Sequence, residues 1–243
     1  MMPALRVRYQ TIEFDQIDIH LCTLKNKNQF SDPSGEALEL GISSALWPMF
    51  GVIWPSSMVL AHYISTFETQ GKRILEIGCG MGLSSLLLNK QKADITATDY
   101  HPEVNYFLQR NAALNSDKEI AFERTNWIDA SDKLGCFDLI IGSDLLYEDN
   151  HIKELAKFIE NHANDSCEVI LVDPGRGRKN KLSLQMNAYG FSCSHIKPPH
   201  TDYLIDLFNG DIMRFARNRT SKLAGRLAMP AQNLSFLLLR LSP

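Results

Sequence analysis

The sequence predicts an α/β fold built on a doubly wound, mostly parallel sheet of seven strands. From residue 73 onward, short apolar runs typical of buried strands alternate with segments that carry apolar residues at helical spacing. The links between these segments are short, and a glycine-rich turn joins the first strand of the series to the first helix. Because the crossover between parallel strands is right-handed, this alternation places helices on both faces of one sheet.

Length and composition set only broad limits. The chain has 243 residues, 44% of them hydrophobic and 22% charged, which is an ordinary globular mixture with enough chain for a sizeable core. A net charge of -3 gives no general preference for nucleic acid or for an anionic membrane. We therefore expect one large domain or two small ones, whose function must be inferred from local motifs.

The cysteines and the N-terminus predict a cytoplasmic protein. Five scattered cysteines without a CxxC pair favour free thiols over a disulfide framework or a zinc site. Residues 1–10 lack the apolar core of a signal peptide, and no stretch approaches the roughly 18 apolar residues of a membrane span. Seven histidines show no HxxxH or HxH spacing, so we predict no metal site.

The first 45 residues are predicted to form an extension that packs on a main domain of residues 46–243. Residues 5–24 alternate in two runs around Asp15-Gln16, which predicts a β-hairpin. Residues 25–41 are polar and predict a loop. The aromatic, proline-rich stretch 46–57 then leads into a helix that Ser56 or Ser57 is expected to cap.

The main domain contains the alternating strands and helices. Strands are predicted at 73–77, 94–98, 120–124, 137–143 and 168–173, and helices at 82–90, 102–114, 150–162 and 178–189. Two later strands, at 190–196 and 234–241, are expected to close the edge of the sheet. The intervening segment 197–233 is too long for a hairpin turn, so we predict an insert between the last two strands.

The glycine-rich turn after the first of these strands is a candidate ligand site. Gly78, Gly80 and Gly82 let the backbone approach a ligand, and the free N–H groups at a helix start attract a carboxylate or phosphate. The G-x-G-x-G spacing misses the dinucleotide fingerprint, and Glu76 would repel a pyrophosphate. A cationic, zwitterionic cofactor such as S-adenosylmethionine suits both features. The alternative is a plain strand-turn-helix without a ligand.

Further candidates follow at later strand ends, where doubly wound sheets bind ligands. Asp99 ends the second strand and could accept both hydroxyls of a ribose, or cap the next helix. Trp127 follows the third strand, where its indole could lie beside an adenine ring. The alternative is an aromatic side chain packed in the core. Asp144 and Tyr147 follow the fourth, where one helical turn would place both side chains on one face. The alternative to a functional role for this pair is that Asp144 caps a helix and Tyr147 packs in the protein.

These motifs, together with Val52-Ile-Trp-Pro-Ser56, resemble the seven-β-strand protein-lysine methyltransferases, the group related to nicotinamide N-methyltransferase. The similarity runs from about Val52 to Asp173 in the family's order. The glycine motif is shared by many S-adenosylmethionine enzymes, whereas the Trp-Pro stretch and the Asp-x-x-Tyr motif are more selective. The resemblance implies a class I, Rossmann-like methyltransferase that uses S-adenosyl-L-methionine to methylate lysine side chains of a protein substrate.

The resemblance also implies individual roles at the cofactor. Residues 78–80 would line its methionine part, Asp99 would bind the ribose, Trp127 and Ser143 would flank the adenine, and Trp54 would close over it from the N-terminal side. The predicted cofactor-binding residues are Trp54, Glu76, Gly78, Cys79, Gly80, Gly82, Asp99, Tyr100, Trp127 and Ser143.

Asp144 and Tyr147 are the predicted catalytic residues, and the resemblance implies that they border a channel for the accepting amine. Methyl transfer from a sulfonium needs a neutral nucleophile aligned behind the methyl group. An ordinary carboxylate, with a pKa of about 4, is a feeble base for a lysine ammonium with a pKa of about 10. We therefore expect Asp144 to hold the ammonium and aim its lone pair while the proton leaves through water. Tyr147 would offer its ring face to a cation, or its hydroxyl as an acceptor.

Three other functions remain open. Basic residues in 176–181 and 211–230 could form a phosphate-binding face of a nucleic-acid methyltransferase, although such runs are usually solvated. Enzymes that methylate exocyclic base amines usually carry Asp/Asn-Pro-Pro-aromatic where this chain has Asp144-Leu-Leu-Tyr147, so this function is less favoured. A small-molecule N-methyltransferase would use the hairpin or the insert as a lid, and a non-enzymatic binding module is the third alternative. The sequence leaves the substrate, the number of methyl groups and the oligomeric state open.

Overall fold

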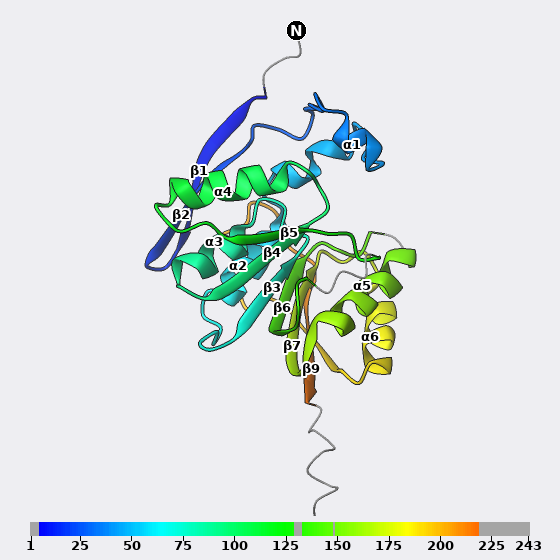
Figure 1. Cartoon of the computed structure of the whole chain (residues 1–243). Helices are drawn as coiled ribbons and strands as arrows, with labels where there is room; N and C mark the ends of the chain where they lie inside the picture. The colour runs from blue at the N-terminus through cyan, green and yellow to red at the C-terminus, as the bar shows by residue number, and fades with distance from the viewer. Residues whose placement is uncertain (1–4, 129–132, 148, 219–243) are drawn as a thin grey trace, which may run out of the picture.

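The computed structural model describes residues 5–128, 133–147 and 149–218. Its main sheet has seven strands in the order β5-β4-β3-β6-β7-β9-β8 (Figure 1). These strands are β3 (Arg73–Ile77), β4 (Asp94–Asp99), β5 (Ala121–Arg124), β6 (Phe137–Ser143), β7 (Ala163–Asp173), β8 (Ser192–Ile196) and β9 (Asp211–Asn218). The pairs from β5 across to β7 are parallel, whereas β9 runs antiparallel to both β7 and β8. The predicted doubly wound, mostly parallel sheet is confirmed.

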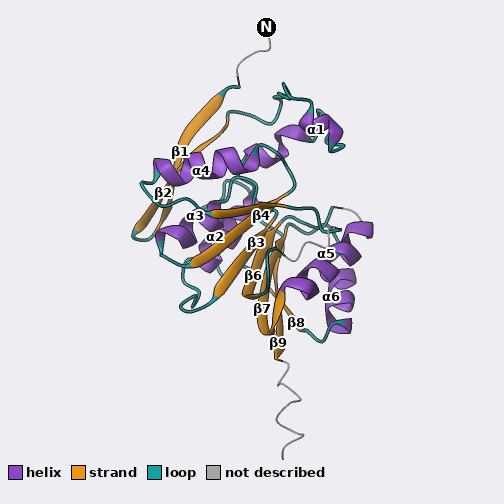
Figure 2. Ribbon diagram, in the orientation of Figure 1, coloured by secondary structure: helices purple, strands orange, loops and turns teal. Residues whose placement is uncertain are grey.

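Helices cover both faces of this sheet, as the alternation predicts (Figure 2). They are α2 (Pro55–Ile64), α3 (Leu83–Lys90), α4 (Val104–Leu114), α5 (Asp149–His162) and α6 (Lys179–Ala188). Residues from α2, α3 and α4 pack with one side of the strands, and residues from α5 and α6 pack with the other. Neighbouring strand residues such as Ile74 and Leu75 therefore belong to opposite cores, which explains the continuous apolar runs of the parallel strands.

The edge of the sheet beyond β7 differs from its prediction. The predicted strand at 234–241 lies outside the described residues. The seventh strand is β9, inside the segment expected to be the insert, so the connection between the last two described strands spans only 197–210. In this strand, buried residues such as Met213 and Phe215 alternate with more exposed ones. The basic residues of this segment obscured the alternation in the sequence. Arg217 is compatible with a buried strand position because it is only 4% exposed and forms an ion pair with Glu160.

The N-terminal hairpin is confirmed, with β1 (Val7–Phe14) and β2 (Ile17–Leu24) joined at Asp15. Asn111 of α4 and Asn115, the C-cap of that helix, bind the free edge of β2 much as another strand would. The side chain of Asn111 accepts from the N–H of Cys22 at 2.7 Å and donates to its carbonyl, and Asn115 makes the same pair of bonds to His20. These paired bonds satisfy backbone groups of the edge strand and anchor the hairpin to α4.

The segment between the hairpin and the sheet differs from its prediction in two places. The expected loop at 25–41 contains a short helix, α1 (Glu36–Glu39). Helix α2 follows the 3₁₀ turn η1 (Trp47–Gly51) and begins at Pro55 with Trp54 as its N-cap, so neither Ser56 nor Ser57 caps it. Proline suits the first helical position because the N–H that it lacks would have no helical partner there.

Two further observations concern predicted absences. All five cysteines are free in the structure. Within the described ranges, no helix combines the length and the apolar character that crossing a bilayer requires.

Candidate active site

The glycine turn lies at the carboxyl end of β3, against two other loops. Gly78, Gly80 and Gly82 have φ values of 61°, 52° and 69°, a left-handed region that side chains disfavour. A Cβ on Gly78 would lie 2.6 Å from Cδ2 of Leu145, and one on Gly80 would lie 3.2 Å from the carbonyl oxygen of Phe50. The turn therefore needs glycine both for its backbone conformation and for its close neighbours.

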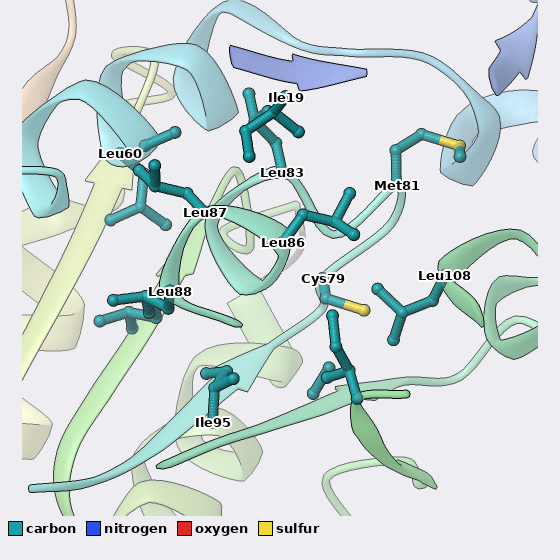
Figure 3. Close-up of a cluster of buried hydrophobic side chains, with 14 of the residues drawn as sticks. Ile19, Leu60, Cys79, Met81, Leu83, Leu86, Leu87, Leu88, Ile95 and Leu108 are labelled. Carbon is teal, nitrogen blue, oxygen red and sulfur yellow. The ribbon is translucent and has the colours of Figure 1, made fainter. Parts of the chain in front are cut away.

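Cys79, between the first two glycines, has its backbone in the turn and its side chain in the core. Its N–H donates to the carbonyl of Thr98 at 2.9 Å, which ties the turn to β4. The thiol is 6% exposed and belongs to the same buried cluster as Leu86 and Leu108 (Figure 3). Burial raises the pKa of this thiol well above its ordinary value. Cys79, a predicted cofactor residue, can therefore face a ligand only with its backbone.

Glu76 is buried beneath the turn and caps the helix that follows it. Its carboxylate accepts from the N–H of Ser85 at 2.9 Å and from the Ser85 hydroxyl. Gly82, the N-cap of α3, has no side chain to do this, so a carboxylate from the preceding strand satisfies the helix start. Burial raises the pKa of Glu76 to about 7, the Ser85 hydrogen bonds lower it, and Asp99 raises it slightly.

This raised pKa predicts how stability depends on pH in the cofactor-free protein. The folded protein holds a proton that the unfolded chain releases above its ordinary pKa of 4.5, so the stabilisation is present below that pH and is lost as pH rises through about 7. Between pH 5 and 8 we expect the free energy of unfolding to fall by up to about 3 kcal/mol relative to Glu76→Gln. Denaturant titrations at several pH values measure this difference. Glu119→Gln, at an exposed position, is the control, and parallel pH curves for wild type and Glu76→Gln would contradict the assignment.

Asp99 joins the glycine turn to the loop after β4. One carboxylate oxygen accepts from the N–H of Gly80 and the other from the N–H of His101, each at 2.9 Å. Burial raises the pKa of Asp99, and these backbone hydrogen bonds oppose the shift. Its neighbour Tyr100 extends elsewhere, since its hydroxyl donates to the carbonyl of Leu40 at 3.0 Å. Asp99 is thus at the turn, whereas the Tyr100 hydroxyl contacts the N-terminal segment.

An aromatic cluster that the sequence analysis did not single out holds the segment before α2 against the turn. The ring of Phe50 stacks on His101 with centroids 4.1 Å apart, and both rings contact the buried Trp47 edge-on. Burial lowers the pKa of His101 to about 4, which keeps the stacked imidazole neutral. Trp54 is half-buried, and its indole N–H donates to the carbonyl of Met49 at 2.9 Å. The aromatic residues at 47–54 were the signal in the sequence that could have indicated this cluster. Nothing in the sequence indicated that His101 is their partner.

The predicted adenine neighbours come from two different strand ends. Trp127 follows β5, is half-buried, and meets the ring of His151 edge-on with centroids 6.0 Å apart. Ser143 is the last residue of β6 and pairs with Val172 of β7. Both lie at the carboxyl edge of the sheet, on the same edge as the glycine turn.

Asp144 and Tyr147 come together by a route that the sequence analysis did not predict. Asp144 has a φ of 58°, and α5 begins only at Asp149, so the expected helical turn from 144 to 147 is wrong. A left-handed residue interrupts the helical path. Instead, Arg176 links the two side chains. Its Nε and Nη2 lie 2.8 and 2.7 Å from Oδ1 of Asp144, and its guanidinium carbon lies 4.5 Å from the centre of the Tyr147 ring.

Burial and the neighbouring charge shift the pKa of Asp144 in opposite directions. Asp144 is only 6% exposed, and burial raises its pKa, whereas the hydrogen bond and charge of Arg176 lower it. Burial, with the nearby Asp144 charge, also raises the pKa of Tyr147 to about 12. The site is therefore a buried carboxylate and an aromatic ring arranged around one cation.

Several residues of the basic runs that suggested a phosphate-binding face form ion pairs with carboxylates of the same chain. Beyond the Arg176 pair, Lys179 lies 2.6 Å from Asp211 and Arg214 lies 3.5 Å from Glu168. Arg217 is buried with Glu160. The rest of the second run, from residue 219 onward, lies outside the described residues. Across the described part of the chain, no group of three or more His, Cys, Asp or Glu side chains could hold a metal ion.

Comparisons with known proteins point to one family. A sequence profile of a family described as lysine methyltransferase matches residues 43–186. A calmodulin-lysine N-methyltransferase of Arabidopsis thaliana is 30% identical over 139 residues, which are 51% of this chain and 45% of that protein. A histidine protein methyltransferase 1 homolog of Dictyostelium discoideum is 32% identical over 124 residues, 47% of this chain and 40% of that protein. The match thus spans less than half of either relative.

A solved structure shares the fold. The crystal structure of a methyltransferase from Pyrococcus furiosus superposes with a TM-score of 0.55 at 22% sequence identity, covering 66% of this chain and 83% of that one. The class I, Rossmann-like arrangement expected from the sequence is therefore confirmed.

Proposed function

The chain belongs to the lysine methyltransferase family, and from this membership we propose that it transfers a methyl group from S-adenosylmethionine to a lysine side chain of a protein. The observation that carries the proposal is the cation site at the end of β6. There the Asp144 carboxylate and the Tyr147 ring hold a positively charged group, and Leu145 between them packs against the glycine turn. A site for a cation beside a site for a cofactor is what methylation of an ammonium-bearing side chain requires.

The residues at the turn fit S-adenosylmethionine. Its sulfonium and ammonium groups are positive, and the turn is flanked by the carboxyl groups of Glu76 and Asp99. The backbone of residues 78–80 would hold the methionine part, Asp99 the ribose hydroxyls, and Trp127 and Ser143 the adenine. When bound, the cofactor supplies an electrophilic methyl group. Trp54 would cover it from the segment that the aromatic cluster holds in place.

The side chains at the cation site position the acceptor. Asp144 would hold the lysine ammonium through charge-assisted hydrogen bonds, and Tyr147 would offer its ring face to the same group. Burial of Asp144 strengthens the interaction with its carboxylate because the local dielectric is low, whereas the Tyr147 ring is 48% exposed. The ammonium must lose its proton to water before its lone pair is available, since a carboxylate is a weak base for it. Asp144 therefore directs the nitrogen and does not need to retain the proton.

Two observations weigh against the alternatives. Four basic residues of the supposed phosphate-binding face are paired with carboxylates of the same chain, which leaves less net positive charge for nucleic acid. Within the described ranges, the hydrogen bonds from the hairpin strands to the rest of the chain go to Arg110, Asn111 and Asn115, in or directly after α4. This attachment favours a protein side chain over a small molecule, because a small-molecule enzyme would use the hairpin as a lid over the amine site.

A labelling experiment tests this function. Purified protein is incubated with radiolabelled S-adenosylmethionine and a cell lysate, in parallel samples treated with nuclease or with protease. We expect the label in macromolecules that resist nuclease and are destroyed by protease. A product that nuclease destroys would show that the substrate is a nucleic acid, and label confined to small molecules would also refute the proposal.

A further inference from the structure

Arg176 occupies the place at which the proposed function seats the substrate. Its guanidinium makes the two contacts that an incoming lysine ammonium would make, an ion pair with Asp144 and a cation–π contact with Tyr147. We propose that Arg176 is an internal substitute for the substrate cation, which fills the amine site of the resting protein and moves out when a lysine side chain enters. This inference rests on the proposed function and adds a selectivity device to it.

The loop that carries Arg176 is built for such a movement. Gly175 and Gly177 flank it with φ values of 101° and 79°, and a Cβ on Gly177 would meet nothing within 4 Å. On the strand side, the buried carboxylate of Asp173 accepts the N–H groups of Gly175 and Arg176 at 2.9 and 3.0 Å. The base of the loop is therefore fixed, whereas the Arg176 side chain is 36% exposed and has a path to solvent.

Charge explains why the site should keep a cation at all times. An unpaired carboxylate as buried as Asp144 is costly, and Arg176 neutralises it in the absence of substrate. Exchanging a guanidinium for an ammonium preserves this pairing, whereas a neutral side chain would leave Asp144 uncompensated. Lys179, three residues further along the chain, pairs with Asp211 at 2.6 Å.

The identity of the internal cation also matters. A guanidinium stays protonated at physiological pH and its nitrogen lone pairs are delocalised, so Arg176 is a much poorer methyl acceptor than a lysine amine while it occupies the site. A lysine at this position can lose a proton to water. Its Nζ would stand five bonds from Cα, as the guanidinium carbon of arginine does, and so within reach of the same site.

The substitution Arg176→Lys tests the inference without any external substrate. We expect the variant to methylate itself: a bond forms between Nζ and the methyl carbon, the bond from that carbon to sulfur breaks, and the ammonium proton goes to water. S-adenosylhomocysteine is the second product. Mass spectrometry of the peptide that contains residue 176 should show added methyl groups in Arg176→Lys and none in the wild type.

The outcomes separate this inference from the proposed function. If wild type binds S-adenosylmethionine in calorimetry and labels lysate protein, but Arg176→Lys stays unmodified, the substitute role is wrong and the function stands. If wild type neither binds the cofactor nor labels protein, the proposed function itself fails. Methylation of Arg176 in the wild type would also overturn the inference, because the internal cation would then be a substrate.

A second variant asks whether Arg176 competes with the substrate or supports it. Arg176→Gln should lower the amount of lysate protein needed for half-maximal labelling, by roughly twofold to fivefold, since the substrate no longer displaces an ion pair. Arg178→Gln removes a positive charge from the same loop and serves as the control. A loss of labelling in Arg176→Gln with normal cofactor binding would show that Arg176 positions Asp144, contrary to the inference.

Discussion

Replacing Asp144 with asparagine or alanine should reduce methyl transfer by at least about a thousandfold while cofactor affinity stays within a factor of two or so. The neutral side chain cannot pair with the substrate ammonium, and Asp144 is the carboxylate that contacts a cation at the end of β6. Asparagine is the sharper variant because it tolerates the φ of 58° at this position, whereas alanine adds backbone strain. Radiolabel transfer to lysate protein and calorimetry with S-adenosylmethionine measure the two effects.

A matched control separates this effect from a general loss of stability. Asp165→Asn removes the same charge at an exposed position of β7 and should leave both quantities unchanged. If Asp144→Asn binds cofactor poorly while its thermal unfolding is normal, Asp144 is a cofactor residue and the division of the site into two parts is wrong.

Replacing Asp99 with alanine should weaken S-adenosylmethionine binding by roughly a hundredfold, or about 3 kcal/mol. The substitution removes the proposed acceptor for the ribose hydroxyls. It also leaves the N–H groups of Gly80 and His101 without the carboxylate that they bind, so the glycine turn loses one of its anchors. Calorimetry of the purified variant measures the affinity.

The control for Asp99 must show that the fold survives. Thermal unfolding should report a single transition in the variant, and Glu123→Gln on the neighbouring strand β5 should bind cofactor like wild type. Unchanged affinity in a folded Asp99→Ala protein would remove Asp99 from the cofactor site and leave it as a structural anchor of the turn.

Much of the fold could be predicted because its parallel strands are continuous apolar runs. Strands β3 and β6 have the bounds that the sequence predicts, since both faces of each strand are buried. Strand β9 could not be predicted because Arg214 and Arg217 interrupt its pattern. Their partners, Glu168 and Glu160, come from other elements, so the charges become compatible with a strand only in the folded chain.

The site was predictable to the level of strand ends and no further. The rule that ligands bind at the carboxyl ends of a doubly wound sheet places Asp99 and Asp144 correctly on one edge. It does not give the conformation after a strand, so the left-handed Asp144 and the missing helical turn were unforeseen. The Arg176 contact depends on β6 and β7 being neighbours and on the loop path after Asp173, which spacing in the sequence does not contain.

The most direct test of the account is the identity of the amino acid that carries the label. Protein labelled by the wild-type enzyme is hydrolysed completely, and the radioactive amino acids are separated against methylated lysine, arginine and histidine standards, with Asp144→Asn as the negative control. The account predicts that the label elutes with methylated lysine and is absent from the Asp144→Asn sample. Label in methylhistidine or methylarginine, or undiminished methyl-lysine in that variant, would contradict it.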